Sequence, residues 1–440
     1  MKVLVLGAGH VGRAVVDALY EDHALTVIDV DAQRLAEFAD RYDVRIVQGD
    51  GTTRSVVRKA GVEEADLLIA CGPKEEANLV CAILAKRLSR AKTVVRTTSM
   101  ELLDAWREGE IEVDFMISPE LETAQAIAGI VGLPAARQTD VFAEGRVQIV
   151  EFDVPADVSE DTLVGRPLRR AEIPPSSKVA ALIRDGRMVF PRGEERILPA
   201  DRVVVIASPE SAHAWSRQLT HEDRTIDDIV IFGAGRMGTM MGRVLVGRGM
   251  RVRLVDAHAG RAHDVAEEMP DVRVFQASCF DSTFLERQRI GQAAAVFCMN
   301  DDPKNLYGAV LAKEHGVRLT ITLAHDPAAV DVYERGGVDV AINPRQLTAE
   351  EMVRFAHDPR IHKIAMLEDD RFEVLDITVR PDSKLVNRPL SDLPASNSMV
   401  GAVIRDDRVI FPHGTDVLRA GDRAILFVES GGVAAAERAL

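Results

Sequence analysis

The chain repeats its own sequence at an interval of about 226 residues, and this repeat constrains the fold more than any other feature. The opening stretch MKVLVLGAGHVG (1–12) matches IDDIVIFGAGRMG (226–238) in the second half. Further aligned pairs are Asp29 with Asp256 and Pro119 with Pro344. A repeat of this kind indicates a duplicated structural unit, so both halves are expected to share one architecture.

A second match shows that each half contains two modules. The stretch VAALIRDGRMVFPRGEERILPADRVVVIAS (179–208) matches VGAVIRDDRVIFPHGTDVLRAGDRAILFVE (400–429), with Pro191 aligned to Pro412 and Asp201 to Asp422. The 440 residues are too many for one ordinary core, and two to four domains are expected.

The first module of each half alternates short apolar runs with helical stretches. The runs are KVLVLG, LTVIDV, VRIVQG, DLLIAC, TVVRTT and DFMISP, and helical patterns such as EEANLVCAILAKRLSR lie between them. Buried strands that alternate with helices predict a parallel, doubly wound sheet. A further helix is expected at LETAQAIAGIVG, before Gly132 and Pro134. This α/β domain is predicted over residues 1–136 and again over 226–361.

The second module is smaller and is expected to be α+β. A strand at VQIVEFDV precedes a short helix around Leu163 to Ala171 and three more strands, KVAALIRDG, RMVFPRG and RVVVIAS. The RDG turn between two of these strands is typical of a hairpin. These domains are predicted over residues 137–221 and 362–440, with the polar stretch LTHEDRTID as the linker between the halves.

A glycine-rich loop after the first strand indicates a phosphate-binding turn. The three glycines permit a tight turn, a close approach of the backbone to a pyrophosphate, and close packing of helix on strand. The start of the following helix favours phosphate through its free N–H groups and its dipole. The loop consists of Gly7, Ala8, Gly9, His10, Val11 and Gly12.

Asp29 ends the next strand, where a carboxylate can bind ribose hydroxyls. The alternative is a helix cap, a role for which Asp31 is better placed. An acid rather than an arginine favours NAD or an adenosine nucleotide over NADP.

Further candidates lie at the ends of the third, fourth and fifth strands. An arginine at a strand's carboxyl end can reach a phosphate, and the alternative for Arg96 is an ion pair with a neighbouring acid. The candidates are Gly49, Asp50, Gly51, Cys71, Gly72 and Arg96.

The second copy keeps the motif but changes its rim. Ala277 and Ser278 replace Gly49 and Asp50, and Thr322 is aligned with Arg96. We therefore expect a second nucleotide site with different preferences; the alternative is a domain kept only for packing. Its candidate residues are Gly233, Ala234, Gly235, Arg236, Met237, Gly238 and Asp256.

Hydride transfer needs a proton donor near the nicotinamide, and the small modules offer no cluster of His, Lys or Tyr. His213, His221 and His413 are scattered, and the first two are expected on the surface. The acidic run EFDVPADVSED and the stretch LRRAEIPPSSK are expected to be solvated loops, although the latter could meet an anion. The acidic run contains Asp153, Asp157, Glu160 and Asp161. No metal site and no catalytic residue are predicted.

Charge and hydropathy exclude other classes. The net charge of −15 disfavours nucleic acid as a partner, and no stretch approaches the 18 apolar residues of a membrane span. No signal peptide is found. The four cysteines form no C-x-x-C pair and are expected to be reduced core thiols of a cytosolic protein: Cys71, Cys81, Cys279 and Cys298.

Over essentially its whole length the chain resembles the TrkA family, peripheral subunits of Trk potassium uptake systems. The resemblance rests on GAGHVG with VIDVD, VQGDGT, EEANLVCAILAK, ISPE, the paired segments RPLRRAEIP and RPLSDLP, and the fourfold order of modules. The large modules are similar to RCK domains (regulators of potassium conductance), with a Rossmann-like fold, and the small ones to the TrkA-C domain.

The resemblance implies a regulatory role rather than an enzymatic one. Four chains would form a ring of eight RCK units on the cytoplasmic face of the membrane, peripherally bound to a TrkH-like channel subunit. NAD(H), ATP or ADP in the clefts would set the ring's shape and so the channel's gate. The family's ligand contacts fall by motif on the candidate residues of both loops named above.

Two other classes compete with this interpretation. A soluble NAD-dependent oxidoreductase would need a catalytic donor that the sequence does not offer. A redox-sensing DNA repressor would need a basic helix-turn-helix, and the acidic chain has no such segment. The small modules could bind a cyclic dinucleotide or a divalent cation, and nothing in the residues selects one.

Overall fold

The computed structural model describes residues 1–133, 136–143, 146–158, 163–184, 187–189, 191–220, 226–353, 356, 361–367, 372–390, 398–406 and 408–429. In these residues four sheets follow one another along the chain, two six-stranded and two five-stranded in alternation. This order confirms the predicted fold class. The predicted domain boundaries remain predictions.

The first sheet is parallel and doubly wound, with strand order β3-β2-β1-β4-β5-β6. Its order reverses between β1 and β4, and ligands of such sheets bind in the crevice at the carboxyl ends of the strands at this point. Its strands are β1 (Lys2–Leu6), β2 (Ala24–Asp29), β3 (Arg45–Gln48), β4 (Leu67–Ala70), β5 (Lys92–Arg96) and β6 (Phe115–Ile117). Its helices are α1 (His10–Leu19), α2 (Ala32–Arg41), α3 (Arg54–Lys59), η1 (Val62–Glu64), α4 (Glu75–Leu88) and α5 (Met100–Arg107).

The third sheet repeats this topology, with order β14-β13-β12-β15-β16-β17. Its strands are β12 (Asp228–Phe232), β13 (Arg251–Asp256), β14 (Arg273–Gln276), β15 (Ala294–Phe297), β16 (Leu319–Leu323) and β17 (Val340–Ile342). Its helices are α8 (Arg236–Gly247), α9 (Ala259–Glu268), α10 (Ser282–Arg287), η4 (Ile290–Gln292), α11 (Asp302–Glu314), η5 (Pro327–Ala329) and α12 (Val330–Arg335).

The strand registers correct one aligned position. Thr322 pairs with Phe297 in the second copy, as Val95 pairs with Ala70 in the first. Leu323, one residue later, is therefore the counterpart of Arg96, and the predicted match of Thr322 with Arg96 is wrong. The second copy still lacks an arginine at this point, because Leu323 is an apolar core residue.

The two smaller sheets are antiparallel and share one order, β10-β9-β11-β8-β7 and its copy β21-β20-β22-β19-β18. The sequence did not indicate β7 or β18, the edge strands next to β8 and β19. The elements are β7 (Ala136–Phe142), β8 (Val147–Asp153), β9 (Ser177–Arg184), β10 (Arg187–Val189), β11 (Arg202–Ala207), α7 (Pro209–Thr220), β18 (Ile361–Leu367), β19 (Phe372–Thr378), β20 (Ser398–Arg405), β21 (Arg408–Ile410) and β22 (Arg423–Glu429).

The expected helix around Leu163 to Ala171 is wrong. Only the short 3-10 turn η3 (Leu168–Arg170) forms there. The preceding residues make isolated bridges instead, Val164 with Ile197 and Pro167 with Arg196. Pro167 has no N–H to donate to a helix, and Gly165 has a positive φ of 81°, which a helix does not use. The predicted hairpin is confirmed by the antiparallel pairing of Arg184 with Arg187, although its turn residues lie outside the described ones.

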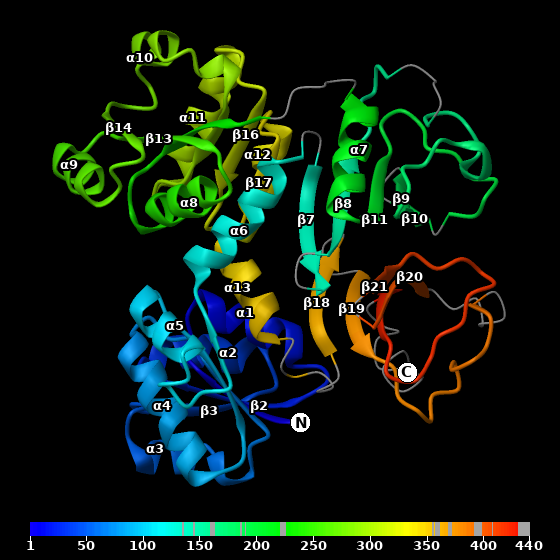
Figure 1. Ribbon diagram of the computed structural model, residues 1–440. Coiled ribbons are helices and arrows are strands. Elements are labelled where there is room, and N and C mark those ends of the chain that lie inside the picture. Colours follow the sequence, from blue (N-terminus) through cyan, green and yellow to red (C-terminus); the bar gives the residue numbers. More distant parts are fainter. Residues whose placement is uncertain are drawn as a thin grey trace. The chain divides into compact units, whose positions relative to one another are not determined.

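One helix leaves each large sheet, α6 (Pro119–Val131) or α13 (Pro344–Val353), and the first confirms the helix predicted at LETAQAIAGIVG. Helix α13 packs on α1, so the described part of residues 341–359 belongs to the same compact unit as residues 1–124 (Figure 1). Ala349 and Met352 share a core cluster with Val15 and Val16 of α1. Local sequence patterns predict that a helix forms, but not which helix its apolar side meets.

Candidate functional site

The glycine loop between β1 and α1 is closed by two contacts that leave no room for a side chain. Gly7 has a φ of 109°, and a Cβ on it would lie 2.8 Å from the Cα and N of Gly72. A Cβ on Gly12 would lie 1.9 Å from the carbonyl oxygen of Gly7. Both glycines are therefore required by the fold itself, whatever the loop binds.

Gly9 is different, because a Cβ built on it meets no atom of the described residues within 4 Å. It is the N-cap of α1, and no side chain caps the helix there. The first N–H groups of α1 thus begin at an open surface, the arrangement that suits an anion. The fold does not require glycine at this position, whereas a ligand that approaches the backbone closely would.

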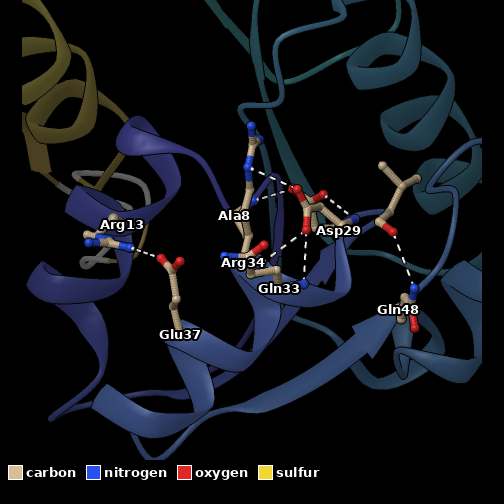
Figure 2. A network of polar contacts seen from close by, with 9 residues as sticks. Ala8, Arg13, Asp29, Gln33, Arg34, Glu37 and Gln48 are labelled. Atoms are coloured by element: carbon tan, nitrogen blue, oxygen red, sulfur yellow. Dashed lines mark hydrogen bonds and ion pairs between the residues drawn. The ribbon is translucent and has the colours of Figure 1, made fainter.

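Asp29 lies directly beneath the loop and is 8% exposed. Its Oδ2 accepts from the N–H of Ala8 at 2.6 Å (Figure 2). Its Oδ1 accepts from the N–H of Asp31 at 2.9 Å. Asp31, not Asp29, caps α2, because it accepts from the N–H groups of Gln33 and Arg34. The helix-cap alternative for Asp29 is therefore wrong. Its carboxylate is fixed at the end of β2, where it can receive ribose hydroxyls.

Gly49, Asp50 and Gly51 follow β3. A Cβ on Gly49 would lie 2.6 Å from Val56, and one on Gly51 would lie 2.5 Å from Leu6, so both glycines serve packing. Asp50 is exposed, and hydrogen bonds from the N–H and hydroxyl of Thr52 lower the pKa of its carboxyl. Of the three, only Asp50 presents a side chain that can meet a ligand.

Cys71 and Gly72 follow β4. The Cys71 thiol donates to the carbonyl oxygen of Leu6 at 3.4 Å, and burial raises its pKa to about 12. This thiol supports the glycine loop from below and stays protonated. Gly72 presents its backbone to Gly7, as described above.

Arg96 ends β5 and donates from Nη1 to the carbonyl oxygen of Gly72 at 3.3 Å. Among the described residues no acid forms an ion pair with it, contrary to the alternative considered from sequence. Its Nε is buried and lacks a hydrogen-bond partner within the described part of the chain. A buried cationic donor without a partner favours an anionic ligand, because such a group is costly to leave unsatisfied.

Sequence reasoning missed Asn78, which is fully buried on α4. Its Nδ2 donates to the carbonyl oxygens of Gly72 and Arg96, both at 3.0 Å, and so ties the ends of β4 and β5 together. Its counterpart Asn305 holds both the N–H and the carbonyl of Met299. An asparagine on the apolar face of a predicted helix is the signal that could have identified both.

The second loop has the same scaffold. The φ of Gly233 is 111°, and a Cβ on Gly238 would lie 1.8 Å from the Gly233 carbonyl oxygen. Asp256 accepts from the N–H of Ala234 at 2.9 Å and from that of His258 at 2.8 Å. A Cβ on Gly235, the N-cap of α8, meets only Arg261 Nη1, at 4.0 Å, among the described atoms.

The charges around the two loops differ. Arg261 Nε lies 3.5 Å from the carboxylate of Asp256, whereas the corresponding Arg34 pairs with Asp31 at 3.4 Å. Arg236 is exposed in the second loop and Met237 is half-buried. The acid of the second loop is thus shared with an arginine, so the two loops present different surfaces to a nucleotide.

The remaining candidates gather at neither loop. His213 is half-buried, contrary to the expected surface position, while Asp153, Asp157 and His413 are exposed. His221, Glu160 and Asp161 lie outside the described residues. Arg169 of the LRRAEIPPSSK stretch is exposed and pairs with Glu194.

All four cysteines are buried and unbridged, as expected of core thiols. Within the described ranges no group of three or more His, Cys, Asp or Glu could hold a metal ion. No described helix is long and apolar enough to span a membrane.

Comparison with known proteins agrees with this architecture. The TrkA-N domain profile matches residues 3–119 and 229–344, and the TrkA-C domain profile matches 149–220 and 374–440. The Trk system potassium uptake protein TrkA of Halomonas elongata is 31% identical to this chain. The aligned region spans 97% of this chain and 96% of the relative. The Trk system potassium uptake protein TrkA homolog 2 of Methanosarcina mazei is 29% identical over 100% of this chain and 99% of its own length.

Solved structures show the same fold at low identity. The GsuK channel bound to NAD has a TM-score of 0.63 at 16% identity, over 100% of this chain and 78% of that one. GsuK bound to ADP has a TM-score of 0.50 at 13% identity, over 80% of this chain and 68% of that one. The family profiles and the full-length similarity to TrkA proteins show that this chain belongs to the TrkA family.

Proposed function

We propose that the chain is a nucleotide-binding regulatory subunit of a potassium uptake system and not an enzyme. The observation that carries this proposal is the pair of glycine loops, each with an N-cap glycine that the fold does not require and a buried aspartate bonded to the loop backbone. Such a site is suited to bind the phosphates and ribose of a nucleotide.

The ligands proposed are NAD(H), ATP or ADP. They would contact the loop residues 7–12 and 233–238, the acids Asp29 and Asp256, and the rim residues at 49–51, 71, 72 and 96. The names of the relatives in the Trk system, and the NAD and ADP in the titles of the GsuK structures, support this assignment.

The proposed assembly is a ring of four chains, with eight RCK units, on the cytoplasmic face of the membrane beneath a TrkH-like channel subunit. A nucleotide that binds one ring shape more tightly shifts the population toward that shape by its difference in affinity. Coupling of about 1–3 kcal/mol per site is typical, and several sites in one ring add to a larger bias.

The test is potassium flux into vesicles that contain the family's membrane subunit, with and without this protein and each nucleotide. We expect the protein to change the flux, and the size of the change to depend on which nucleotide is present. If the potassium flux is the same with and without a nucleotide that the pure protein binds, the regulatory role is contradicted. Consumption of NADH with a change in nicotinamide absorbance would instead favour an oxidoreductase.

His10 should make binding at the first loop dependent on pH. Burial lowers the pKa of His10, and the charges of Arg345, Arg13 and Arg34 lower it further. The charge of Asp326 raises this pKa in part. An anionic pyrophosphate at the loop raises this pKa again, so the complex takes up part of a proton. Since the protonated form binds the anion better, affinity should rise a few-fold as pH falls from about 7.5 to 5.5.

NAD is the appropriate probe of this effect, because its pyrophosphate does not titrate in that range. Calorimetry in buffers of different ionisation enthalpy reports the proton uptake directly. His10→Gln should remove the uptake and flatten the pH profile of binding at this loop. An unchanged profile in that variant would show that another group titrates.

A further inference from the structure

Helix α1, which begins at the first nucleotide loop, packs against a helix of the second half of the chain. Helix α13 belongs to the second half of the chain but packs on α1 of the first half through apolar side chains. Met352 is fully buried and Val353 is 2% exposed, in one cluster with Val15 and Val16. Because such a contact is part of the core, the residues at the start of α13 have a fixed position relative to the start of α1.

Arg345 is the second residue of α13 and is held in place by its neighbours. Its Nη1 donates to the carbonyl oxygen of His325 at 2.8 Å. Asn343 caps the helix, accepting from the N–H groups of Arg345 at 2.9 Å and Gln346 at 3.0 Å. The Nδ2 of Asn343 is buried and lacks a hydrogen-bond partner among the described residues, so a further donor is available here.

The charge of Arg345 acts on the first residue of α1. After burial, it is the largest of the charges that lower the pKa of His10, ahead of Arg13 and Arg34. Val11, the residue after His10, packs against the cluster that contains Ala349, which lies one helical turn after Arg345. The packing of α13 on α1 and this electrostatic effect together bring the charge of Arg345 within reach of the helix start that would receive phosphate. The three arginines come from three helices, α13, α1 and α2. Arg13 pairs with Glu37 and Arg34 pairs with Asp31, whereas Arg345 is held by a neutral carbonyl oxygen, so its charge is not balanced by that contact.

The corresponding residue of the first half carries the opposite charge. Pro119 aligns with Pro344, which makes Glu120 the counterpart of Arg345. The duplication has therefore diverged at a residue that follows the last strand of each large sheet. This reversal gives the two halves different electrostatic contributions and is not required by helix formation, because Glu and Arg are both good helix formers.

We propose that Arg345 is a ligand-contacting residue of the first nucleotide site, supplied by the second half of the chain, and that it selects adenine nucleotides with a terminal phosphate over NAD. The proposal rests on the proposed function. A terminal phosphate carries up to two negative charges and accepts two hydrogen bonds from a guanidinium. NAD has a ribose and a nicotinamide in that place, with no negative charge for Arg345 to pair with.

The experiment is calorimetric titration of the full-length protein with ADP, ATP and NAD. Gly235→Glu is introduced first to restrict binding to the first site, since Gly235 has space for a side chain and a carboxylate there repels phosphate. In this background Arg345→Gln should weaken ADP and ATP by roughly 10-fold or more and NAD by less than about 3-fold. Arg345→Lys keeps the charge and should lose less than Gln does.

Arg107→Gln is the matched control, because it removes one exposed arginine, paired with Asp104 on α5, and changes the net charge equally. It should leave all three affinities within about twofold. The thermal midpoints of the Arg345→Gln and Arg107→Gln variants establish whether each protein is folded. If Arg345→Gln is unfolded, Arg345→Lys is compared with Arg107→Gln in its place.

Three results would overturn the inference. ADP and NAD weakened equally would make Arg345 a residue that only positions the loop. Unchanged ADP affinity would remove it from the site. Loss of all binding in the Gly235→Glu parent, with binding retained by the unmodified protein, would deny a first site. An unmodified protein that binds none of the three would contradict the proposed function itself.

Discussion

Replacing Gly12 by alanine should unfold or strongly destabilise the first large domain. The new Cβ would lie 1.9 Å from the carbonyl oxygen of Gly7. The oxygen is a backbone atom at the end of β1, and the Cβ is attached directly to the backbone of α1. No side chain can move aside, so α1 must separate from the loop. Overpacking costs about 1–3 kcal/mol when side chains can adjust, and a clash between backbone atoms should cost at least the upper end.

The measurement can be confined to this domain, because the chain has two tryptophans. Trp106 lies on α5, bonded to the Val113 carbonyl, and Trp215→Phe leaves it as the only reporter. Its fluorescence during urea unfolding should show a lower midpoint for Gly12→Ala. Gly9→Ala is the matched control, since its Cβ meets no described atom within 4 Å, and its stability should stay within about 1 kcal/mol. Equal midpoints for the two variants would show that the loop relaxes freely.

Replacing Gly9 by glutamate should abolish nucleotide binding at the first loop while the protein stays folded. The side chain extends into the open space before α1, and its carboxylate occupies the place of a phosphate and repels it. We expect an affinity loss of roughly 100-fold or more, which corresponds to about 2.7 kcal/mol. Gly235→Glu should do the same at the second loop.

The pair of variants tests whether the duplication provides two inputs. Titrations with NAD, NADH, ADP, ATP and NADP, read by calorimetry and by the thermal midpoint, should lose different ligands in the two variants. The differing surroundings of Asp29 and Asp256 are the reason, because Arg261 shares the second acid. Loss of every ligand in both variants would contradict two independent sites. If Gly235→Glu binds every nucleotide with unchanged affinity, the second loop has only a structural role.

Much of the architecture followed from the sequence because the relevant interactions are local. Apolar runs such as KVLVLG and DLLIAC form β1 and β4 because a strand buried on both faces has no polar positions. The glycine loop and the acid at the end of β2 follow from spacing, and the structure places Asp29 against Ala8. Asp31 could be identified as the helix cap because a cap acts within three residues of itself.

The errors came from interactions that local patterns do not determine. The sequence pattern predicts a helix near Leu163, but Val164 and Pro167 pair with a distant segment instead. Thr322 was aligned one residue out of register, because only hydrogen-bonded partners define register. β7 and β18 lie at the edges of their sheets. Each is defined by its hydrogen-bonded pairing with one neighbouring strand and not by its amino-acid composition.

The sequence by itself determined the duplication, the fold class and both nucleotide motifs, since these depend on spacing along the chain. The tertiary structure alone decided three things: that Gly9 is open while Gly12 is not, that Asn78 joins β4 to β5, and that α13 of the second half packs on α1. Each is a contact between segments distant in sequence. The free energy of such contacts comes from burial and close packing, which depend on where the chain returns and not on its local pattern.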